Sequence, residues 1–341
     1  MPTVLVQGRI AAPHAPRLKR FAPDGWDVTV WDPSSDPVEA FEPLALEADV
    51  IVGGGVPIPW PEVPNLKLFQ IPWTGFDFTA PAKMPPGVLV ANTYEHETTI
   101  AEFIMAGILE MRVGLRQLDC DFRAGGWEGL APGVSPIHRE VRGATLGIIG
   151  YGHIGYETAI RANAFGMRCI GVRRSQQPCP AELAWLGQND RMDELLAQSD
   201  FVLVACDMND ETIGMINAEA LAKMKPDAVI INVARGKIID EDALFDALTD
   251  RRIGGAVLDV WYNYQMPDDP PVWPSNRPFQ DLDNVILSAH RSASTEEMHE
   301  RRWKFVADNC ARIGRGEVPE NIVFTGTGAA SGDVGGAGGI G

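Results

Sequence analysis

Three glycines spaced as Gly-x-Gly-x-x-Gly constrain this chain more than any other feature of its 341 residues. Gly150, Gly152 and Gly155 follow an apolar run and precede a helical stretch, in the order that a strand–turn–helix unit requires. The first glycine permits a tight turn, the second lets the backbone approach a pyrophosphate, and the third allows close packing of helix on strand. The pattern predicts a dinucleotide phosphate bound at a helix N-terminus, with His153 and Ile154 beside it.

Short apolar runs alternate with helical or turn-rich segments along the chain, which is typical of parallel sheets with crossover helices. The alternation occurs in two separate series, so we predict an α/β fold with two Rossmann-like or flavodoxin-like domains. The first series of strand candidates comprises residues 4–6, 27–31, 49–53, 66–71 and 88–91. The second series comprises residues 144–150, 168–172, 201–205, 228–232, 255–260 and 285–288.

Two helical patterns divide these series into domains. Apolar residues recur at helical intervals over 98–116, and a further amphipathic segment follows Ser294. We therefore expect a discontinuous substrate-binding domain of residues 1–97 plus 297–324, and an inserted dinucleotide-binding domain of residues 98–296. Residues 325–341 include eight glycines, so we expect a disordered tail or an appended segment there.

Composition excludes several classes of partner. With 29 Lys+Arg against 46 Asp+Glu, the net charge of −17 disfavours nucleic acids and anionic membrane surfaces. We expect no membrane span, because no run approaches the required ~20 apolar residues, and the N-terminus has no signal-peptide pattern. The five cysteines are scattered without a Cys-x-x-Cys pair, which argues against disulfides and a metal site. These features predict a soluble, cytoplasmic protein.

Four ordered motifs together resemble one family. The glycine turn 146–155 is followed by Asn-Val-Ala-Arg-Gly at 232–236, Leu-Asp-Val at 258–260 and Ser-Ala-His at 288–290. This combination is similar to the D-isomer-specific 2-hydroxyacid dehydrogenases, in particular to glyoxylate/hydroxypyruvate reductases. The resemblance implies two domains, a homodimer, a nicotinamide cofactor in the interdomain cleft, and reversible reduction of a 2-oxo acid.

The end of the second strand of the dinucleotide unit indicates which cofactor is used. An NAD-binding chain has a carboxylate there for the ribose 2′-hydroxyl, whereas this chain has Arg173, Arg174 and Ser175. Guanidinium groups can bind a 2′-phosphate through charge-assisted bonds, so NADP(H) is favoured over NAD(H). The alternative is that these arginines are solvated surface residues, and Asp207 could oppose a phosphate. The resemblance also places Cys206, Ala234 and Asp259 at the cofactor.

Two residues fit the chemistry of 2-oxo acid reduction. Arg235 follows an apolar strand, and its planar guanidinium can bind a carboxylate with two bonds. His290 also follows a strand of this series, and its titration near neutral pH suits a general acid that becomes the base in the reverse reaction. The alternatives are a surface arginine and a core histidine. By resemblance, Asp259 contacts the nicotinamide carboxamide; the alternative is an acid that stabilises a turn.

The family's catalytic glutamate is missing. It stands five residues after the aspartate of Leu-Asp-Val and keeps the histidine protonated; in this chain that position is Tyr264. Tyr264 could orient the His290 ring through its hydroxyl, which is the interpretation that we prefer. Gln265 could serve instead, or a remote acid could, namely Asp268, Asp269 or Glu102. Without a carboxylate His290 is neutral more of the time, so we expect fastest reduction on the acidic side of neutral.

The substrate carboxylate is expected to meet the backbone of Trp73, Thr74 and Gly75, by resemblance. Family members usually carry a small residue at the position of Trp73. Several aromatic residues near both substrate segments indicate an apolar or aromatic 2-oxo acid, or else core and dimer packing. A second hypothesis is an NAD(P)-sensing binding protein with little or no turnover. The aromatic residues are Trp73, Trp261, Tyr262, Tyr264 and Trp273.

Overall fold

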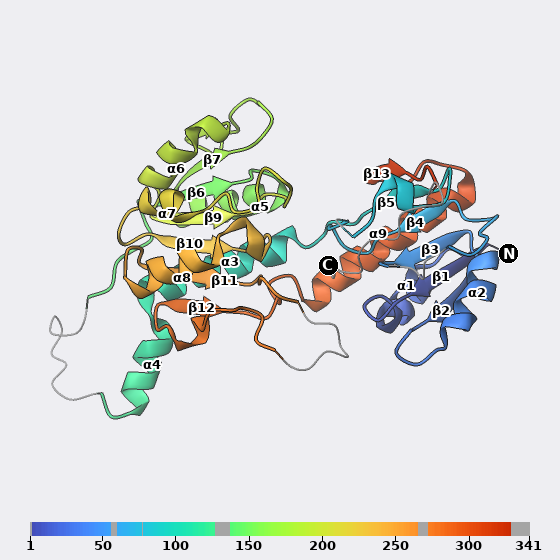
Figure 1. Ribbon diagram of the computed structural model, residues 1–341, viewed down its shortest axis with the longest axis horizontal. Coiled ribbons are helices and arrows are strands. Elements are labelled where there is room, and N and C mark those ends of the chain that lie inside the picture. The colour runs from blue at the N-terminus through green and yellow to red at the C-terminus, as the bar shows by residue number, and fades with distance from the viewer. Residues whose placement is uncertain (1, 56–59, 77, 127–136, 265–271, 329–341) are drawn as a thin grey trace. The chain divides into compact units, whose positions relative to one another are not determined.

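The structure is a computed structural model that describes residues 2–55, 60–76, 78–126, 137–264 and 272–328. It divides into two compact units, one of residues 1–96 and 295–341 and the other of residues 97–294 (Figure 1). Each unit contains one sheet with helices on both faces, which confirms the predicted α/β fold class.

The first unit contains a six-stranded sheet in the order β13-β5-β4-β3-β1-β2. Its first five strands in sequence pair in parallel, and β13 pairs with β5 in the antiparallel direction. The strands are β1 (Thr3–Gln7), β2 (Asp27–Trp31), β3 (Val50–Gly53), β4 (Leu68–Gln70), β5 (Leu89–Ala91) and β13 (Ile322–Thr325).

Apolar side chains cover both faces of this sheet. On one face α1 (Ala15–Phe21) and α9 (Glu296–Arg315) pack against the strands, with Trp303 almost fully buried. On the other face α2 (Phe41–Glu47) contributes Phe41 to a second cluster. The returning C-terminal helix therefore completes a core that begins with the first strand.

The second unit contains a seven-stranded parallel sheet in the order β12-β11-β10-β9-β6-β7-β8. The chain moves outward from β6 to β8 and then crosses to β9 on the opposite side of β6. In such sheets ligands bind at the carboxyl ends of the strands where the order reverses. The strands are β6 (Thr145–Ile149), β7 (Arg168–Val172), β8 (Trp185–Gly187), β9 (Phe201–Val204), β10 (Val229–Asn232), β11 (Gly255–Leu258) and β12 (Val285–Leu287).

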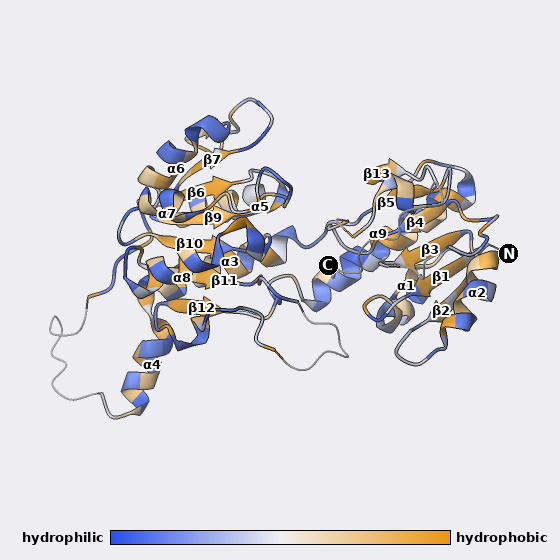
Figure 2. Ribbon diagram, in the orientation of Figure 1, coloured by the Kyte–Doolittle hydropathy of each residue, from blue (hydrophilic) through white to orange (hydrophobic). Residues whose placement is uncertain are grey.

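Helices cover both faces of this sheet, and the strands between them are predominantly apolar (Figure 2). Strands buried on both faces read as continuous apolar runs, which explains why the second series of strands was predictable. One face carries α6 (Met192–Gln198), α7 (Ala218–Ala222) and α8 (Glu241–Thr249). The other carries α3 (Glu97–Val113) and α5 (His153–Ala164).

The structure differs from the predicted elements at one helix and in the C-terminal segment, and it adds two strands, β8 and β13, that neither predicted series included. The single helix expected over 98–116 is two helices, α3 and α4 (Leu115–Arg123), because Gly114 between them has φ +66°. Residues Gly326 and Gly328 donate backbone hydrogen bonds to Val88 and Met84, so the segment just after β13 is ordered.

Within the described ranges, no helix is long and apolar enough to cross a membrane. The same residues contain no group of three or more His, Cys, Asp or Glu side chains arranged to hold a metal ion.

Candidate active site

Three adjacent strands bring the predicted catalytic residues to one edge of the sheet. Arg235 follows β10, Asp259 follows β11, and His290 follows β12. These strands are parallel neighbours, so their carboxyl ends lie side by side. The parallel sheet thereby brings three residues that are far apart in the sequence to the same edge.

The Tyr264 hydroxyl lies 3.1 Å from Nδ1 of His290. The same hydroxyl oxygen accepts a hydrogen bond of 3.1 Å from the backbone N–H of Trp261. Among the other candidates for the missing glutamate, Gln265, Asp268 and Asp269 lie outside the described residues. The structure therefore places Tyr264 beside His290, at the position where the family resemblance implies a glutamate.

His290 has an unusual backbone conformation, with φ +56°. Residues other than glycine adopt this left-handed region at a cost of about 1–3 kcal/mol, and they retain it only when surrounding contacts enforce it. One such contact is the hydrogen bond of 2.8 Å from the His290 backbone N–H to the carbonyl of Asp259. The turn after β12 is thus tied to the end of β11.

Charges and burial act on both side chains of this pair. His290 is an exposed residue, yet desolvation by nearby protein atoms lowers the pKa of its ring below 6.5. Asp259 opposes this shift by raising the pKa, and Arg235 adds to it by lowering the pKa. Desolvation raises the pKa of the Tyr264 phenol above 10, so the phenol keeps its proton at neutral pH.

Asp259 is fully buried, and its carboxylate accepts hydrogen bonds from the residues that follow His290. Oδ1 accepts from the Arg291 N–H at 2.8 Å and from the Ser292 N–H at 3.2 Å. The Ser292 hydroxyl also donates to Oδ2. These are the contacts of an acid that stabilises a turn, which was the alternative interpretation of Asp259; a contact with nicotinamide stays a prediction.

Arg235 is half-buried at the end of β10, and the turn that carries it is held by Asn232. The Asn232 side chain donates to the Arg235 carbonyl at 3.0 Å and accepts from the Ala234 N–H at 3.1 Å. Because Asn232 is itself almost fully buried, this turn is fixed to the sheet. Ala234 lies beside Arg235 and accepts a bond from its guanidinium at 2.9 Å.

The glycine turn has the form that a dinucleotide phosphate requires. Gly150 has φ +93°, and a Cβ there would lie 2.5 Å from the Cys206 backbone. A Cβ at Gly152 would meet nothing within 4 Å, so the backbone is open on that side. Gly152 is also the N-cap of α5, and no side chain caps it. The N-terminal amides of the helix therefore fit a pyrophosphate.

The remaining glycine and its neighbours complete this turn. Gly155 is buried, and a Cβ there would lie 3.1 Å from the Ile148 side chain, so it allows α5 to pack closely on β6. His153 and Ile154 occupy the first positions of α5. Cys206 follows β9, the strand next to β6, so it reaches the same edge.

Arg173, Arg174 and Ser175 follow β7 at this edge of the sheet. The Arg173 guanidinium donates to Gln177 at 2.5 Å, while Arg174 and Ser175 are exposed. Within the described residues, no ion pair with a carboxylate involves Arg173. Its charge is therefore not neutralised by a neighbouring acid. Asp207 is also exposed, one residue beyond Cys206.

In the first unit, the loop of Trp73, Thr74 and Gly75 is fastened to the end of β5. The Asn92 side chain donates to the Thr74 carbonyl at 2.8 Å. The Thr74 hydroxyl donates to the Thr93 carbonyl at 3.0 Å, and the Thr93 N–H donates to the Trp73 carbonyl at 3.1 Å. Three hydrogen bonds thus fix the backbone of the predicted substrate loop.

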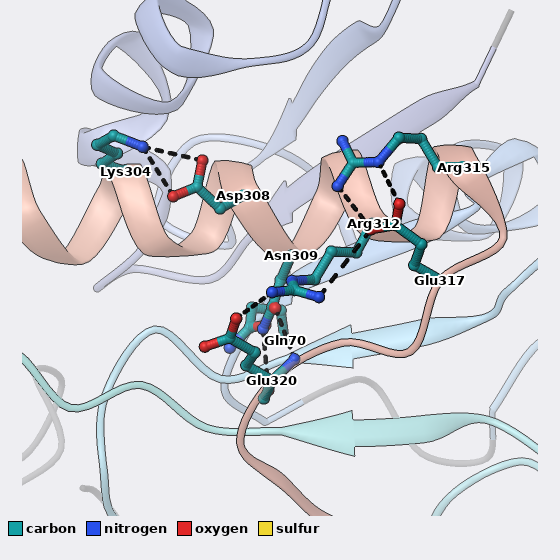
Figure 3. Close-up of polar contacts among 8 residues, drawn as sticks. All are labelled: Gln70, Lys304, Asp308, Asn309, Arg312, Arg315, Glu317 and Glu320. Carbon is teal, nitrogen blue, oxygen red and sulfur yellow. Dashed lines mark hydrogen bonds and ion pairs between the residues drawn. The ribbon is translucent and has the colours of Figure 1, made fainter.

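A buried polar network, which was not predicted from the sequence, is connected to this loop by hydrogen bonds. Asn309 of α9 donates to the Gln70 side chain at 2.7 Å and to the Glu320 carbonyl at 3.1 Å (Figure 3). Gln70 in turn donates to the Thr93 hydroxyl at 3.0 Å, and Thr93 donates to the Ile71 carbonyl at 2.9 Å. Gln70, Thr93 and Asn309 are almost fully buried. The network connects α9 to the start of the loop.

Most of the aromatic residues near the predicted site are packing residues. The Trp73 indole rests on Gly54, where a Cβ would lie 2.7 Å from the ring. Trp261 and Tyr262 pack against Phe279 at ring-centroid distances of 6.3 and 6.4 Å. Of the segment after β11, the aromatic residues that remain exposed are Tyr264 and Trp273.

Comparisons with known proteins show the family to which the chain belongs. A family model described as "D-isomer specific 2-hydroxyacid dehydrogenase, NAD binding domain" matches residues 105–292. A glyoxylate reductase of Thermococcus onnurineus is 34% identical over 268 residues, covering 76% of this chain and 77% of the relative. A glyoxylate/hydroxypyruvate reductase B of Pectobacterium carotovorum is 32% identical over 335 residues, covering 94% of this chain and 98% of the relative.

Solved structures share the fold. A D-isomer specific 2-hydroxyacid dehydrogenase family protein from Aeromonas salmonicida gives a TM-score of 0.77 at 23% identity, covering 95% of this chain and 99% of that one. An NADPH-dependent glyoxylate/hydroxypyruvate reductase from Sinorhizobium meliloti, in complex with NADP and sulfate, gives 0.74 at 24% identity, covering 95% and 98%.

The chain therefore belongs to the D-isomer-specific 2-hydroxyacid dehydrogenase family, which confirms the resemblance of its motifs. It is an NAD(P)-dependent oxidoreductase that acts on 2-oxo and 2-hydroxy acids.

Proposed function

We propose that this enzyme reduces a small 2-oxo acid, such as glyoxylate or hydroxypyruvate, to the D-2-hydroxy acid with NADPH. The observation that carries the proposal is the cluster of Arg235, His290 and Tyr264 at adjacent strand ends. Relatives named for glyoxylate and hydroxypyruvate reduction support the substrate class.

Each residue of the cluster has a separate task. Arg235 binds the substrate carboxylate through its guanidinium and polarises the adjacent carbonyl. His290 gives its proton to the carbonyl oxygen during reduction and takes it back during oxidation. Bound NADPH supplies the hydride for C2. Tyr264 holds the imidazole so that Nε2 is left for the substrate.

The packing of Trp73 favours a small substrate. Its indole lies on Gly54 and against Phe78, so this part of the first unit is filled by the protein's own side chain. The backbone of the loop from Trp73 to Gly75 then remains to receive the carboxylate. Trp261 and Tyr262 are occupied in packing on Phe279, so they do not argue for an aromatic 2-oxo acid.

Arg235 provides the test of this function. We expect Arg235→Ala to raise the KM for glyoxylate about 100-fold, because two charge-assisted hydrogen bonds are lost. Lys237→Ala, an exposed residue of the same turn, should leave the KM unchanged. If the purified enzyme binds NADPH but reduces no member of a 2-oxo acid panel, the alternative of an NAD(P)-sensing protein replaces this proposal.

The preference for NADPH rests on Arg173, Arg174 and Ser175. We expect Arg173→Asp to raise the KM for NADPH at least about 10-fold without raising that for NADH, since a carboxylate repels the 2′-phosphate. Arg168→Ala is the control, because Arg168 lies at the opposite end of β7. Equal effects on both cofactors would show that Arg173 does not read the phosphate.

We also infer that the enzyme forms a homodimer through the second unit. Helix α4 contains no buried residue, and its Leu115 and Leu118 side chains are 65% and 44% exposed. An apolar row of this kind on a surface helix favours association. We propose Arg123–Trp127 and the Pro-rich segment before Val141 as the arm of this dimer; residues 127–136 lie outside the described residues.

A further inference from the structure

The hydrogen bonds of the Tyr264 hydroxyl determine what it can do for His290. The Trp261 backbone N–H can only donate, so the Tyr264 oxygen accepts from it and the phenol proton is left for another partner. That partner is Nδ1 of His290 at 3.1 Å. A neutral His290 accepts this proton at Nδ1 when its own proton is on Nε2; when its own proton is on Nδ1, the ring donates to the Tyr264 oxygen and Nε2 is free to act as a base.

The same hydroxyl also accommodates the charged ring. When His290 is protonated, Nδ1–H donates to the Tyr264 oxygen, and the phenol proton rotates away. A hydroxyl thus bonds to the ring in both protonation states without adding a charge, whereas a glutamate carboxylate would add a negative charge that favours the imidazolium. Tyr264 fixes the orientation of the ring but does not favour the imidazolium that proton donation requires.

A negative charge for the imidazolium is nevertheless present nearby. The groups that act electrostatically on His290 are Arg235, which lowers its pKa, and Asp259, which raises it. Tyr264 is neutral at the relevant pH. Asp259 is the nearby group whose charge opposes both desolvation and Arg235. Its backbone carbonyl accepts the His290 N–H, so the two residues are joined where β11 and β12 end.

The turn after β12 supplies hydrogen-bond donors to both oxygens of the Asp259 carboxylate. A buried carboxylate without partners would favour protonation, but hydrogen bonds to its oxygens favour the anion. Here the donors are the backbone N–H groups of Arg291 and Ser292 and the Ser292 hydroxyl. All three donors come from the turn that begins at His290, so the Asp259 carboxylate clamps the turn that carries the imidazole.

We propose that Asp259 supplies the negative charge for protonated His290 while Tyr264 only orients the ring, so that two residues divide the task of one glutamate. Both are positioning residues, and Ser292 is a third because it holds the Asp259 carboxylate. This inference rests on the proposed function of His290 as the proton donor. It also accounts for the left-handed backbone of His290, which the clamp on residues 291–292 enforces.

The test is an NMR titration of His290 in the full-length enzyme with ¹⁵N-labelled histidine, with His290→Asn used to assign its signal. We expect Asp259→Asn to lower the pKa of His290 by about one pH unit, because a nearby opposite charge is removed. Tyr264→Phe should leave this pKa nearly unchanged but alter the tautomer populations of neutral His290, which the ¹⁵N shifts report. Ser292→Ala should lower the pKa by a smaller amount.

Ser292→Ala also covers the case in which Asp259→Asn does not fold, because it keeps the carboxylate and removes one donor. If neither variant moves the pKa of His290, or if Tyr264→Phe moves it as far as Asp259→Asn, the division of tasks is wrong. The titration needs no substrate, so it stands apart from turnover. If the variants shift the pKa of His290 as expected but the enzyme reduces no 2-oxo acid, only the proposed function is refuted.

Discussion

The backbone of Gly236 lies against that of Trp261, so that a Cβ at position 236 would be 2.2 Å from the Trp261 carbonyl oxygen. This contact joins the turn that carries Arg235 to the segment that carries Tyr264. Only glycine permits the approach, because any side chain would push the two segments apart. The residue after the arginine therefore sets the spacing between the predicted carboxylate-binding group and the predicted ring-orienting hydroxyl.

Gly236→Ala should damage both stability and turnover. The added methyl group meets backbone rather than a movable side chain, so we expect a loss of about 1–3 kcal/mol in the free energy of unfolding. Because Arg235 moves with its turn, kcat/KM should fall at least about 10-fold. Denaturant titration and steady-state kinetics measure the two effects. Gly55→Ala, where a Cβ would meet nothing within 4 Å, is the control that should change neither.

Gln70 and Asn309 should behave as an energetically coupled pair. Gln70→Leu leaves the Asn309 amide with one buried partner fewer, and Asn309→Leu does the same to Gln70. We expect each single variant to cost about 1–3 kcal/mol in unfolding free energy and the double variant to cost less than their sum. Strictly additive costs in urea titrations would contradict the network.

The same pair should influence the substrate loop. Gln70 donates to Thr93, which holds the loop through the Ile71 and Trp73 carbonyls. Gln70→Leu should therefore raise the KM for the 2-oxo acid several-fold and leave the KM for NADPH unchanged, because the cofactor is expected on the second unit.

Acid should destabilise the first unit through two stacked histidines. The rings of His14 and His299 lie 4.3 Å apart, and desolvation by burial and then the charge of His299 lower the pKa of His14 to about 4. The folded state thus favours neutral His14, so this stability is present above pH 6.5 and is lost as the pH falls toward 4. Both side chains are partly exposed, so we expect a loss of about 1 kcal/mol.

Urea unfolding at pH 7.5 and pH 5 measures this loss. The variant His14→Gln, His299→Gln cannot be protonated at this stack, so its stability should fall less over the same interval. If the double variant loses as much stability as the parent between pH 7.5 and pH 5, the acid sensitivity does not come from these two histidines.

Leu118 should control the oligomeric state. We expect Leu118→Glu on α4 to shift the enzyme from dimer to monomer in sedimentation at micromolar concentration, because a charge would be buried in the interface. Gln117→Ala changes a polar residue of the same helix and should leave the dimer intact. A parent enzyme that sediments as a monomer at all concentrations would exclude the homodimer.

The sequence predicted the parts of this molecule that local patterns determine. The buried strands appear as apolar runs, and the glycine turn, Arg235 and His290 each follow such a run, so their common edge could be expected. The break at Gly114 was missed because the apolar positions continue through it, and only its positive φ divides the helix.

Contacts between distant residues could not be predicted. Gln70 and Asn309 are 239 residues apart, and nothing in either neighbourhood indicates the other. Ser292 stood two residues after His290, but its bond to Asp259 depends on the pairing of β11 with β12. Tyr264 was one of several alternatives for the missing glutamate, and its distance to His290 became apparent only in the folded chain.

The first unit is assembled from both ends of the chain, which has a consequence during protein synthesis. Its first five strands leave the ribosome before α9 and β13 have been synthesised. The part of the sheet that Trp303 and Val306 cover therefore stays exposed to solvent while residues 97–294 are translated. The inserted unit can fold first. Newly made chains should therefore depend on chaperones chiefly for the interval before their last helix emerges.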